Sequence, residues 1–379
     1  MAQELQVVHG QPSWRVSTAQ VEAFVTELGG QLGPVTFNRG KHDIRPFPMP
    51  PWIDEPLDED VSPILRALRG DFFCLPFGAN TTPYNGELHP EHGQPVHRLW
   101  NFESNTECAV QLSQETTIRQ GRIDKWLELR PGHPALYQRH VISGMAGPMP
   151  LGHHAMVLFP DRAGSGVLSM SPFVHGQVFP GQFENPEQKG YSSLSPGALF
   201  SSLSNVPLAV GGETDLSRYP ARRGFDDLVM LVSDDDLAFA WTAVVFADER
   251  FVWFALRDPR VLRSTVLWFS NGGRHASPWN GRHVNLMGIE HVTAYFHRGL
   301  AESALDNSIR QLGYPTALEL DPSTPLVVNH IMGATAIPES FDRVAAIVPD
   351  GLGIVRLIAD SGYEVVVPLD LAFLGTDAG

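Results

Sequence analysis

The sequence predicts an all-β protein, built as a large antiparallel sandwich of two β-sheets with few short helices. Three observations predict this class. Short segments rich in β-branched and aromatic residues recur along the 379 residues, turn residues separate most of them, and few segments show a helical period. The 35 glycines and 31 prolines also fit many turns better than long helices.

The expected strands follow one another at the short intervals that are typical of a sandwich or barrel. They cover residues 21–28, 109–114, 126–130, 135–142, 166–170, 228–232, 237–246, 251–256, 265–269 and 292–296. Glycine-rich turns such as Gly29-Gly30 and Asn271-Gly272-Gly273 punctuate them.

Two short helices are expected between these strands. The first covers residues 64–69, because Ser62-Pro63 supplies an N-cap and a first-turn proline, and a glycine follows the segment. The second covers residues 300–312, where apolar residues recur on one face until Gly313 ends the pattern. Residues 178–207 are rich in Gly, Ser, Pro and Asn and predict a long loop of the kind that often carries function.

The pattern of the chain changes after about residue 312. Residues 326–328, 344–348, 353–358 and 363–369 predict a further set of strands. We therefore expect residues 1–312 to form the β-sandwich domain. Residues 313–379 would form a C-terminal β extension that packs on the same domain.

Composition excludes several classes of function. The net charge of −15 disfavours nucleic acid and anionic membrane surfaces as partners. Two cysteines give neither a disulfide framework nor a paired-cysteine metal site. The first ten residues show no signal-peptide pattern, and no apolar run approaches 18 residues, so a cytoplasmic location is expected.

Histidines are concentrated in residues 87–100, a segment that Pro and Gly residues make a loop. The loop could form the polar rim of a pocket, with Trp100 as a platform for the C–H face of a pyranose. A second interpretation is a metal site made by His89, His92 and His97 with a glutamate of the loop. A solvated loop with surface histidines is the third.

A Gly-His-His sequence opens the apolar segment that starts at residue 151. If this segment is a strand, His153 and His154 point to opposite faces, and only one of them can face a given pocket. The alternative is a buried histidine that hydrogen-bonds to its surroundings and has no role in binding.

The third candidate segment runs from Trp279 to Glu290 through an Asn-Gly turn. Glu290 borders an expected strand, and a buried carboxylate needs a partner or has a raised pKa. A raised pKa suits a general base that works near neutral pH. The alternative is a paired glutamate with a structural role.

Asp226 and Asp227 precede another expected strand. Either carboxylate could accept hydrogen bonds from sugar hydroxyls, or both could belong to the turn.

Taken in order, these segments resemble the aldose 1-epimerase (galactose mutarotase-like) family. His92-Gly93 followed by Trp100 is similar to its His-Gly loop, and Gly152 to Val157 resembles its segment with the catalytic histidine. Gly288-Ile289-Glu290 is similar to its glutamate segment, and residues 71–78 resemble its stretch ending in Pro-x-x-Gly. The resemblance covers residues 10–300, with Val96 and Asn80 where arginines are usual.

The resemblance implies a galactose mutarotase-like supersandwich and an enzyme that interconverts the anomers of a monosaccharide or sugar derivative. Glu290 aligns with the general base and His154 with the acid. His92, Asp226 and His153 are candidates for binding the sugar, as are the rings of Trp100 and Trp279. No metal or organic cofactor is implied. A non-catalytic sugar-binding protein and a metal-dependent isomerase or hydrolase remain the alternatives.

Overall fold

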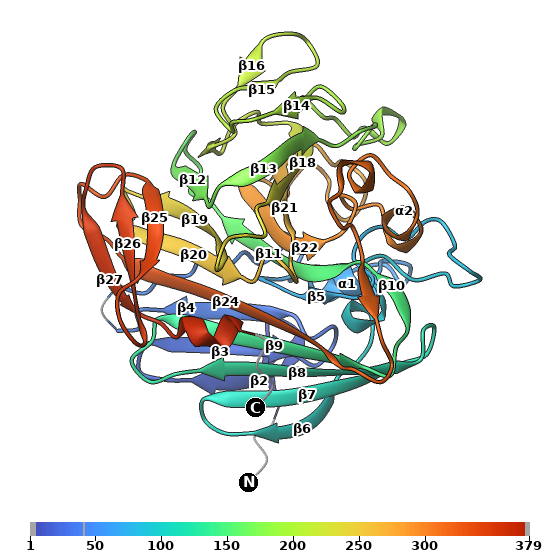
Figure 1. Ribbon diagram of the computed structural model, residues 1–379, viewed down its shortest axis with the longest axis horizontal. Helices are drawn as coiled ribbons and strands as arrows, with labels where there is room; N and C mark the ends of the chain where they lie inside the picture. The colour runs from blue at the N-terminus through green and yellow to red at the C-terminus, as the bar shows by residue number, and fades with distance from the viewer. Residues whose placement is uncertain (1–4, 41, 376–379) are drawn as a thin grey trace.

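The larger of two main sheets has nine antiparallel strands and extends to the lower edge of the molecule in Figure 1. The computed structural model describes residues 5–40 and 42–375. In sheet order the strands are β17 (Arg218–Tyr219), β12 (Gly166–Met170), β19 (Ala240–Phe246), β20 (Phe251–Arg257), β24 (Leu326–Ala336), β9 (Ala135–Ser143), β8 (Gly121–Leu129), β7 (Ala109–Thr116) and β6 (Asn101–Asn105).

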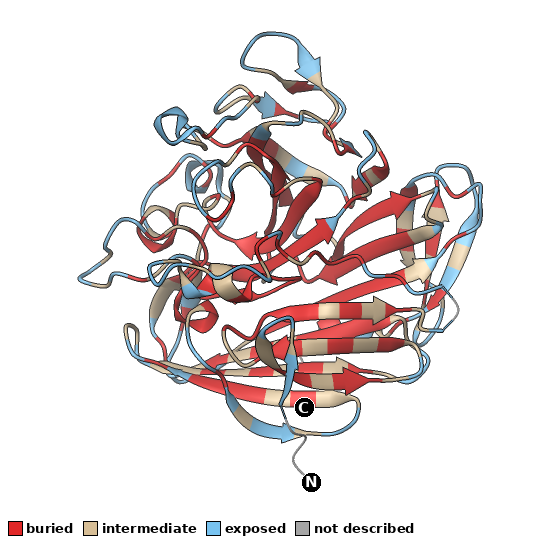
Figure 2. Ribbon diagram, turned by 180° about the vertical axis from the view of Figure 1, so that it is seen from behind, coloured by how far each residue is buried: buried red, intermediate tan, exposed pale blue. Residues whose placement is uncertain are grey.

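The second main sheet has seven antiparallel strands and carries the candidate site. In sheet order they are β14 (Leu199–Phe200), β13 (Phe173–Val178), β18 (Phe225–Ser233), β21 (Ser264–Asn271), β22 (Leu286–Thr293), β11 (Leu151–Leu158) and β5 (Phe73–Cys74). The middle strands are buried along nearly their whole length, as Figure 2 shows in red.

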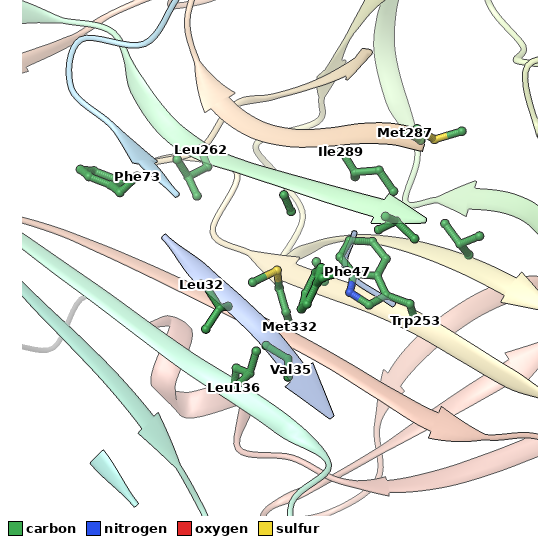
Figure 3. Packing of buried hydrophobic residues seen from close by; sticks show 14 of the residues in the cluster. Leu32, Val35, Phe47, Phe73, Leu136, Trp253, Leu262, Met287, Ile289 and Met332 are labelled. Carbon is green, nitrogen blue, oxygen red and sulfur yellow. The ribbon is translucent and has the colours of Figure 1, made fainter. Parts of the chain in front are cut away.

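Side chains from both sheets meet in one apolar core. Met287 and Ile289 point from β22 into this core, where Trp253 and Met332 of the nine-stranded sheet belong to the same cluster (Figure 3). Successive residues of a strand face opposite sides, so Gly288 and Glu290, which alternate with these core positions, face away from the nine-stranded sheet. A separate cluster of aromatic residues and loop side chains covers that other face.

Smaller sheets complete the architecture. A four-stranded sheet consists of β1 (Gln6–Val8), β2 (Gln11–Ser17), β3 (Val21–Thr26) and β4 (Leu32–Phe37). A three-stranded sheet packs on the outer face of the nine-stranded sheet and consists of β25 (Val344–Pro349), β26 (Ile354–Ala359) and β27 (Glu364–Pro368). Two pairs remain, β10 (Gly147–Met149) with β23 (Leu318–Leu320) and β15 (Val206–Pro207) with β16 (Glu213–Thr214).

The predicted all-β antiparallel sandwich is confirmed, and its helices are shorter than the sequence suggests. The described residues contain two α-helices, α1 (Pro63–Ala67) and α2 (Leu300–Ala304). The helix expected over residues 300–312 stops early because Leu305 is extended. Asn307 then accepts the backbone N–H groups of Ile309 and Arg310, which starts a separate turn.

The chain after residue 312 contributes to several sheets. Its longest strand, β24, lies in the interior of the nine-stranded sheet between β20 and β9, while β25–β27 form their own sheet. Within the described ranges, no helix is both long enough and apolar enough to cross a membrane.

Candidate active site

The candidate site begins with two side chains on neighbouring strands. In the register of β11 and β22, His154 lies directly opposite Glu290, and Nε2 of the imidazole is 3.3 Å from Oε1 of the carboxylate. Both side chains point to the face that is turned away from the nine-stranded sheet, because their neighbours Ala155 and Ile289 lie in the inter-sheet core. Only 7% of the His154 side chain and 3% of the Glu290 side chain are exposed.

A glycine makes room for the glutamate. A Cβ atom at Gly288 would lie 2.7 Å from Oε1 of Glu290 and 3.1 Å from Cβ of Trp268. Contacts that short force a neighbour to move, so a larger residue at position 288 would disturb the place of the carboxylate beside His154.

Aromatic rings fix the position of His154. Phe72 stacks on its imidazole with centroids 4.5 Å apart, and the His92 ring meets it edge-on at 5.0 Å. Nδ1 of His92 contacts Sγ of Cys74 at 3.4 Å. The loop can pass this close because a Cβ at Gly93 would lie 1.9 Å from the carbonyl oxygen of Leu75.

The loop between β21 and β22 supplies a cation and a second aromatic group. The guanidinium of Arg274 lies 5.0 Å from the ring of Trp268 and 5.2 Å from the ring of Trp279. Its Nε donates to Oε1 of Glu184 at 2.7 Å. The ring of His283 stacks on the ring of Trp268, with the two centroids 5.4 Å apart.

Two cavities open beside this arrangement. One of about 290 Å³ is lined by Arg274, Trp279 and Glu91 among others. A second, of about 530 Å³, shares Phe183 and Glu184 with the first. Arg274 thus contacts the cavity on one side, while its charge also acts on Glu290 and His154.

Burial determines the protonation of the Glu290–His154 pair. Loss of hydration raises the pKa of Glu290 to about 8, although the positive charge of Arg274 opposes this rise. Burial also lowers the pKa of His154 to about 4. Near neutral pH the pair therefore holds a single proton, which is the number that one acid and one base need between them.

The two predicted aspartates bond to the protein itself. Asp226 accepts hydrogen bonds from Nε1 of Trp268 at 3.0 Å and from the backbone N–H of Gly273 at 2.7 Å. Asp227 accepts bonds from the backbone N–H and the hydroxyl of Ser193. Asp226 therefore holds the Arg274 loop and the Trp268 ring in place.

Two other candidates lie away from the Glu290–His154 pair. Trp100 is 2% exposed, packs in the inter-sheet core and donates from Nε1 to the carbonyl of Pro95, so its ring faces are covered. His153 points to the opposite side of β11 from His154, where its Nδ1 lies 2.9 Å from Oδ2 of Asp71. Neither side chain lies on the face of the Glu290–His154 pair.

The histidines of the 87–100 loop separate in space. His89 bonds to Glu87 at 3.0 Å, and Nε2 of His97 bonds to the carbonyl of Glu91 at 2.7 Å. His92 alone turns toward His154. Of the described residues, none from this loop belongs to a group with metal-ligand spacing.

The architecture matches several solved structures. An Escherichia coli K12 protein, provisionally described as an aldose 1-epimerase, matches with a TM-score of 0.60 at 11% identity, over 86% of this chain and 100% of its own. A galactose mutarotase related enzyme from Lactobacillus acidophilus matches with a TM-score of 0.56 at 12% identity, over 86% and 97%. A galactose mutarotase-like protein from Lactobacillus casei ATCC 334 matches with 0.56 at 11%, over 85% and 100%.

This is the galactose mutarotase-like fold. The expected fold resemblance is confirmed at the level of structure. No family model and no curated protein sequence matches the chain. At such low identities the comparison shows the fold, and the role of the site has to be argued from its own residues.

Several residues of the site carried no signal in the sequence. Arg274 lies in an irregular loop, Glu184 in another, and Trp268 inside an apolar strand. Nothing in their local patterns indicates that they meet. A buried arginine is seldom unpaired, but which carboxylate would pair with it is a property of the fold.

Proposed function

We propose that the protein is an aldose 1-epimerase that interconverts the anomers of a monosaccharide or a sugar derivative. The observation that carries this proposal is the Glu290–His154 pair, whose two reactive atoms lie 3.3 Å apart. The pair is packed against aromatic rings and is affected by the charge of Arg274, which lines a cavity. A carboxyl group and an imidazole at this distance can both reach one hemiacetal, so that one removes a proton while the other donates one. The fold is one in which aldose 1-epimerase-like proteins are found.

The reaction needs one proton removed and one proton supplied. Glu290 as a carboxylate takes the proton of the anomeric hydroxyl, and protonated His154 gives its proton to the ring oxygen. The C1–O5 bond breaks, and the anomeric oxygen becomes an aldehyde. After rotation about the C1–C2 bond, O5 attacks the other face of C1 while both protons return, so the enzyme ends as it began.

The single proton of the pair makes these roles available. In the free protein, burial favours the proton on Glu290. Transfer to His154 produces the base and the acid together without exchange with solvent. The positive charge of Arg274 favours the carboxylate form of Glu290 and opposes the protonated form of His154.

The sugar would lie against the aromatic side of the cavity. Trp279 lines the cavity and is held edge-on to Trp52 and Trp268, which leaves a rigid ring surface for the C–H face of a pyranose. His92, next to His154, is the proposed hydroxyl ligand. Asp226 takes part indirectly, by holding Trp268 and the Arg274 loop.

Polarimetry tests the proposal. The optical rotation of freshly dissolved α-glucose and α-galactose is followed with wild-type protein, with Glu290→Gln and with Glu319→Gln, an exposed glutamate of β23. Wild type and Glu319→Gln should speed the decay of rotation, and Glu290→Gln should lose ~10² to 10⁴-fold of that rate.

Full activity in folded Glu290→Gln would overturn the assignment of the base. Saccharide binding by the wild type with no acceleration for any hexose would instead support a non-catalytic sugar-binding protein.

A further inference from the structure

A second group of polar side chains lies between the two main sheets. His153 and His291 of this group come from the inner faces of β11 and β22, the strands that carry the Glu290–His154 pair, and most of the others come from the nine-stranded sheet. We call it the inter-sheet cluster. Each of its members is at most 1% exposed. The members are Asp71, Lys125, Gln138, His140, His153, His291 and His330.

Asp71 is the one carboxylate of the inter-sheet cluster. Its Oδ2 accepts a hydrogen bond from Nε2 of Gln138 at 2.7 Å and lies 2.9 Å from Nδ1 of His153. Its Oδ1 has no partner among the described residues. A buried carboxylate oxygen without a donor is costly, so the site has unused capacity for a positive group.

Hydrogen bonds to neighbouring side chains orient the ring of His330. Its Nε2 bonds to Nδ1 of His291 at 2.8 Å, and Nε2 of His291 bonds to the hydroxyl of Thr242 at 3.0 Å. Nδ1 of His330 has no partner in the described part of the chain. The ring stacks on that of His153 at a centroid distance of 4.3 Å.

Three ligand atoms converge here. One oxygen of Asp71 and one nitrogen each of His153 and His330 all lie within 4.8 Å of one another. Two imidazoles and a carboxylate are a donor set for zinc and related first-row metal ions. We propose that Asp71, His153 and His330 bind a divalent transition-metal ion, with zinc as the reference ion, between the two sheets.

The surroundings have the features of a ligand-orienting shell. In metal sites the second nitrogen of a ligand histidine is usually bonded to a neighbour, and ligand carboxylates are held by further hydrogen bonds. His291 does this for His330, and Gln138 does it for Asp71. In tetrahedral zinc sites, ligand atoms lie about 3.4 Å apart and each imidazole holds the ion in its ring plane, so binding would turn the stacked rings of His153 and His330 away from parallel.

A fourth position also fits. The ring of His140 lies 5.0 Å from that of His153, and neither of its nitrogens has a partner among the described residues. Lys125 faces the same space and donates to Oε1 of Gln138 at 3.2 Å.

The proposed ion would connect elements that are far apart in the sequence. Asp71 precedes β5, His153 lies on β11, and His330 lies on β24 of the opposite sheet. His154 and Glu290 point to the other face of the seven-stranded sheet. The ion would therefore brace the sandwich and would take no part in the acid–base chemistry.

Because the ligands are fully buried, the ion would enter during folding. The test therefore compares tag-free protein that is unfolded and refolded with either zinc or a chelator, followed by desalting and elemental analysis. Zinc-refolded wild type should retain one zinc ion per chain and melt at a higher temperature than chelator-refolded protein. Refolding with Co²⁺ should give the visible absorption of a protein-bound ion.

Variants assign the ligands. Asp71→Asn and His330→Gln should each lose the zinc, while His175→Gln, a half-buried histidine on β13, should retain it. Wild type that refolds equally well without zinc and retains none would overturn the proposal, as would zinc retained by folded Asp71→Asn and His330→Gln. The wild-type comparison decides the question even if both variants fail to fold, and it is independent of mutarotation.

Discussion

The two faces of β11 and β22 carry similar side chains in different surroundings. On the outer face, His154 opposes Glu290 beneath the aromatic and loop side chains, and on the inner face His153 opposes His291 between two sheets. Adjacent residues in a strand thus belong to different environments. The chemistry available to a side chain depends here on access to solvent and substrate more than on its residue type.

The hydrogen bonds of the two histidines are alike. Each has one ring nitrogen that faces a carboxylate and one that has no partner among the described residues. The difference lies in the carboxylates: Asp71 also accepts a hydrogen bond from Gln138, whereas burial raises the pKa of Glu290 to about 8. A carboxyl group that titrates near neutral pH can exchange protons with a ligand.

Single substitutions of the two neighbouring histidines should give the largest difference between the two faces. His154→Gln should lower kcat for mutarotation by ~10² to 10⁴-fold, because the group that protonates the ring oxygen is lost. His153→Gln should lower the melting temperature and leave kcat nearly unchanged. Polarimetry and thermal unfolding of both variants check this, and equal kcat losses would show that the two faces are not independent.

Removing the carboxylate of the inner face should mainly affect stability. Asp71→Ala leaves His153 and Gln138 without their buried partner, and breaking a buried charged pair costs about 3–5 kcal/mol. Urea unfolding measures the change, with activity assayed well below the melting temperature. A loss under about 1 kcal/mol would mean that the network contributes little to folding.

The smallest expected effect is the pH dependence of the outer face. The pair needs its single proton, and the pKa of Glu290 is raised to about 8 by burial. Above pH 8 this proton is lost and His154 has none to donate, so kcat/KM should fall about tenfold per pH unit. Polarimetry corrected for the uncatalysed rate measures it, and a flat profile to pH 9.5 would contradict the one-proton pair.

The sequence indicates the fold well because strand formation has a local signature. Alternating or continuous apolar segments with turn residues between them predicted most strands, including the one at residues 251–256 that became β20. The expected helix over residues 300–312 was wrong in length. Apolar residues recur there at helical spacing, but the side chain of Asn307 accepts hydrogen bonds from the backbone N–H groups of Ile309 and Arg310 and so starts a new turn.

The candidate site is less accessible to sequence reasoning because it is assembled across the chain. The alternation rule separated His153 from His154 but did not say which of them faces the cavity, since that depends on sheet packing. Trp100 was considered a stacking platform because aromatic residues near loops often bind sugars. In the fold it fills the core beside Gly30, where a Cβ atom would lie 2.7 Å from its Nε1.

The position of β24 has a consequence for how the protein is made. This strand, residues 326–336, fills the place between β20 and β9, which are synthesised earlier. Until the ribosome has released β24, both neighbours present unpaired backbone edges, which can pair with other chains. Closure of the larger sheet is thus a late event in biosynthesis, and the nascent chain is expected to rely on chaperones until then.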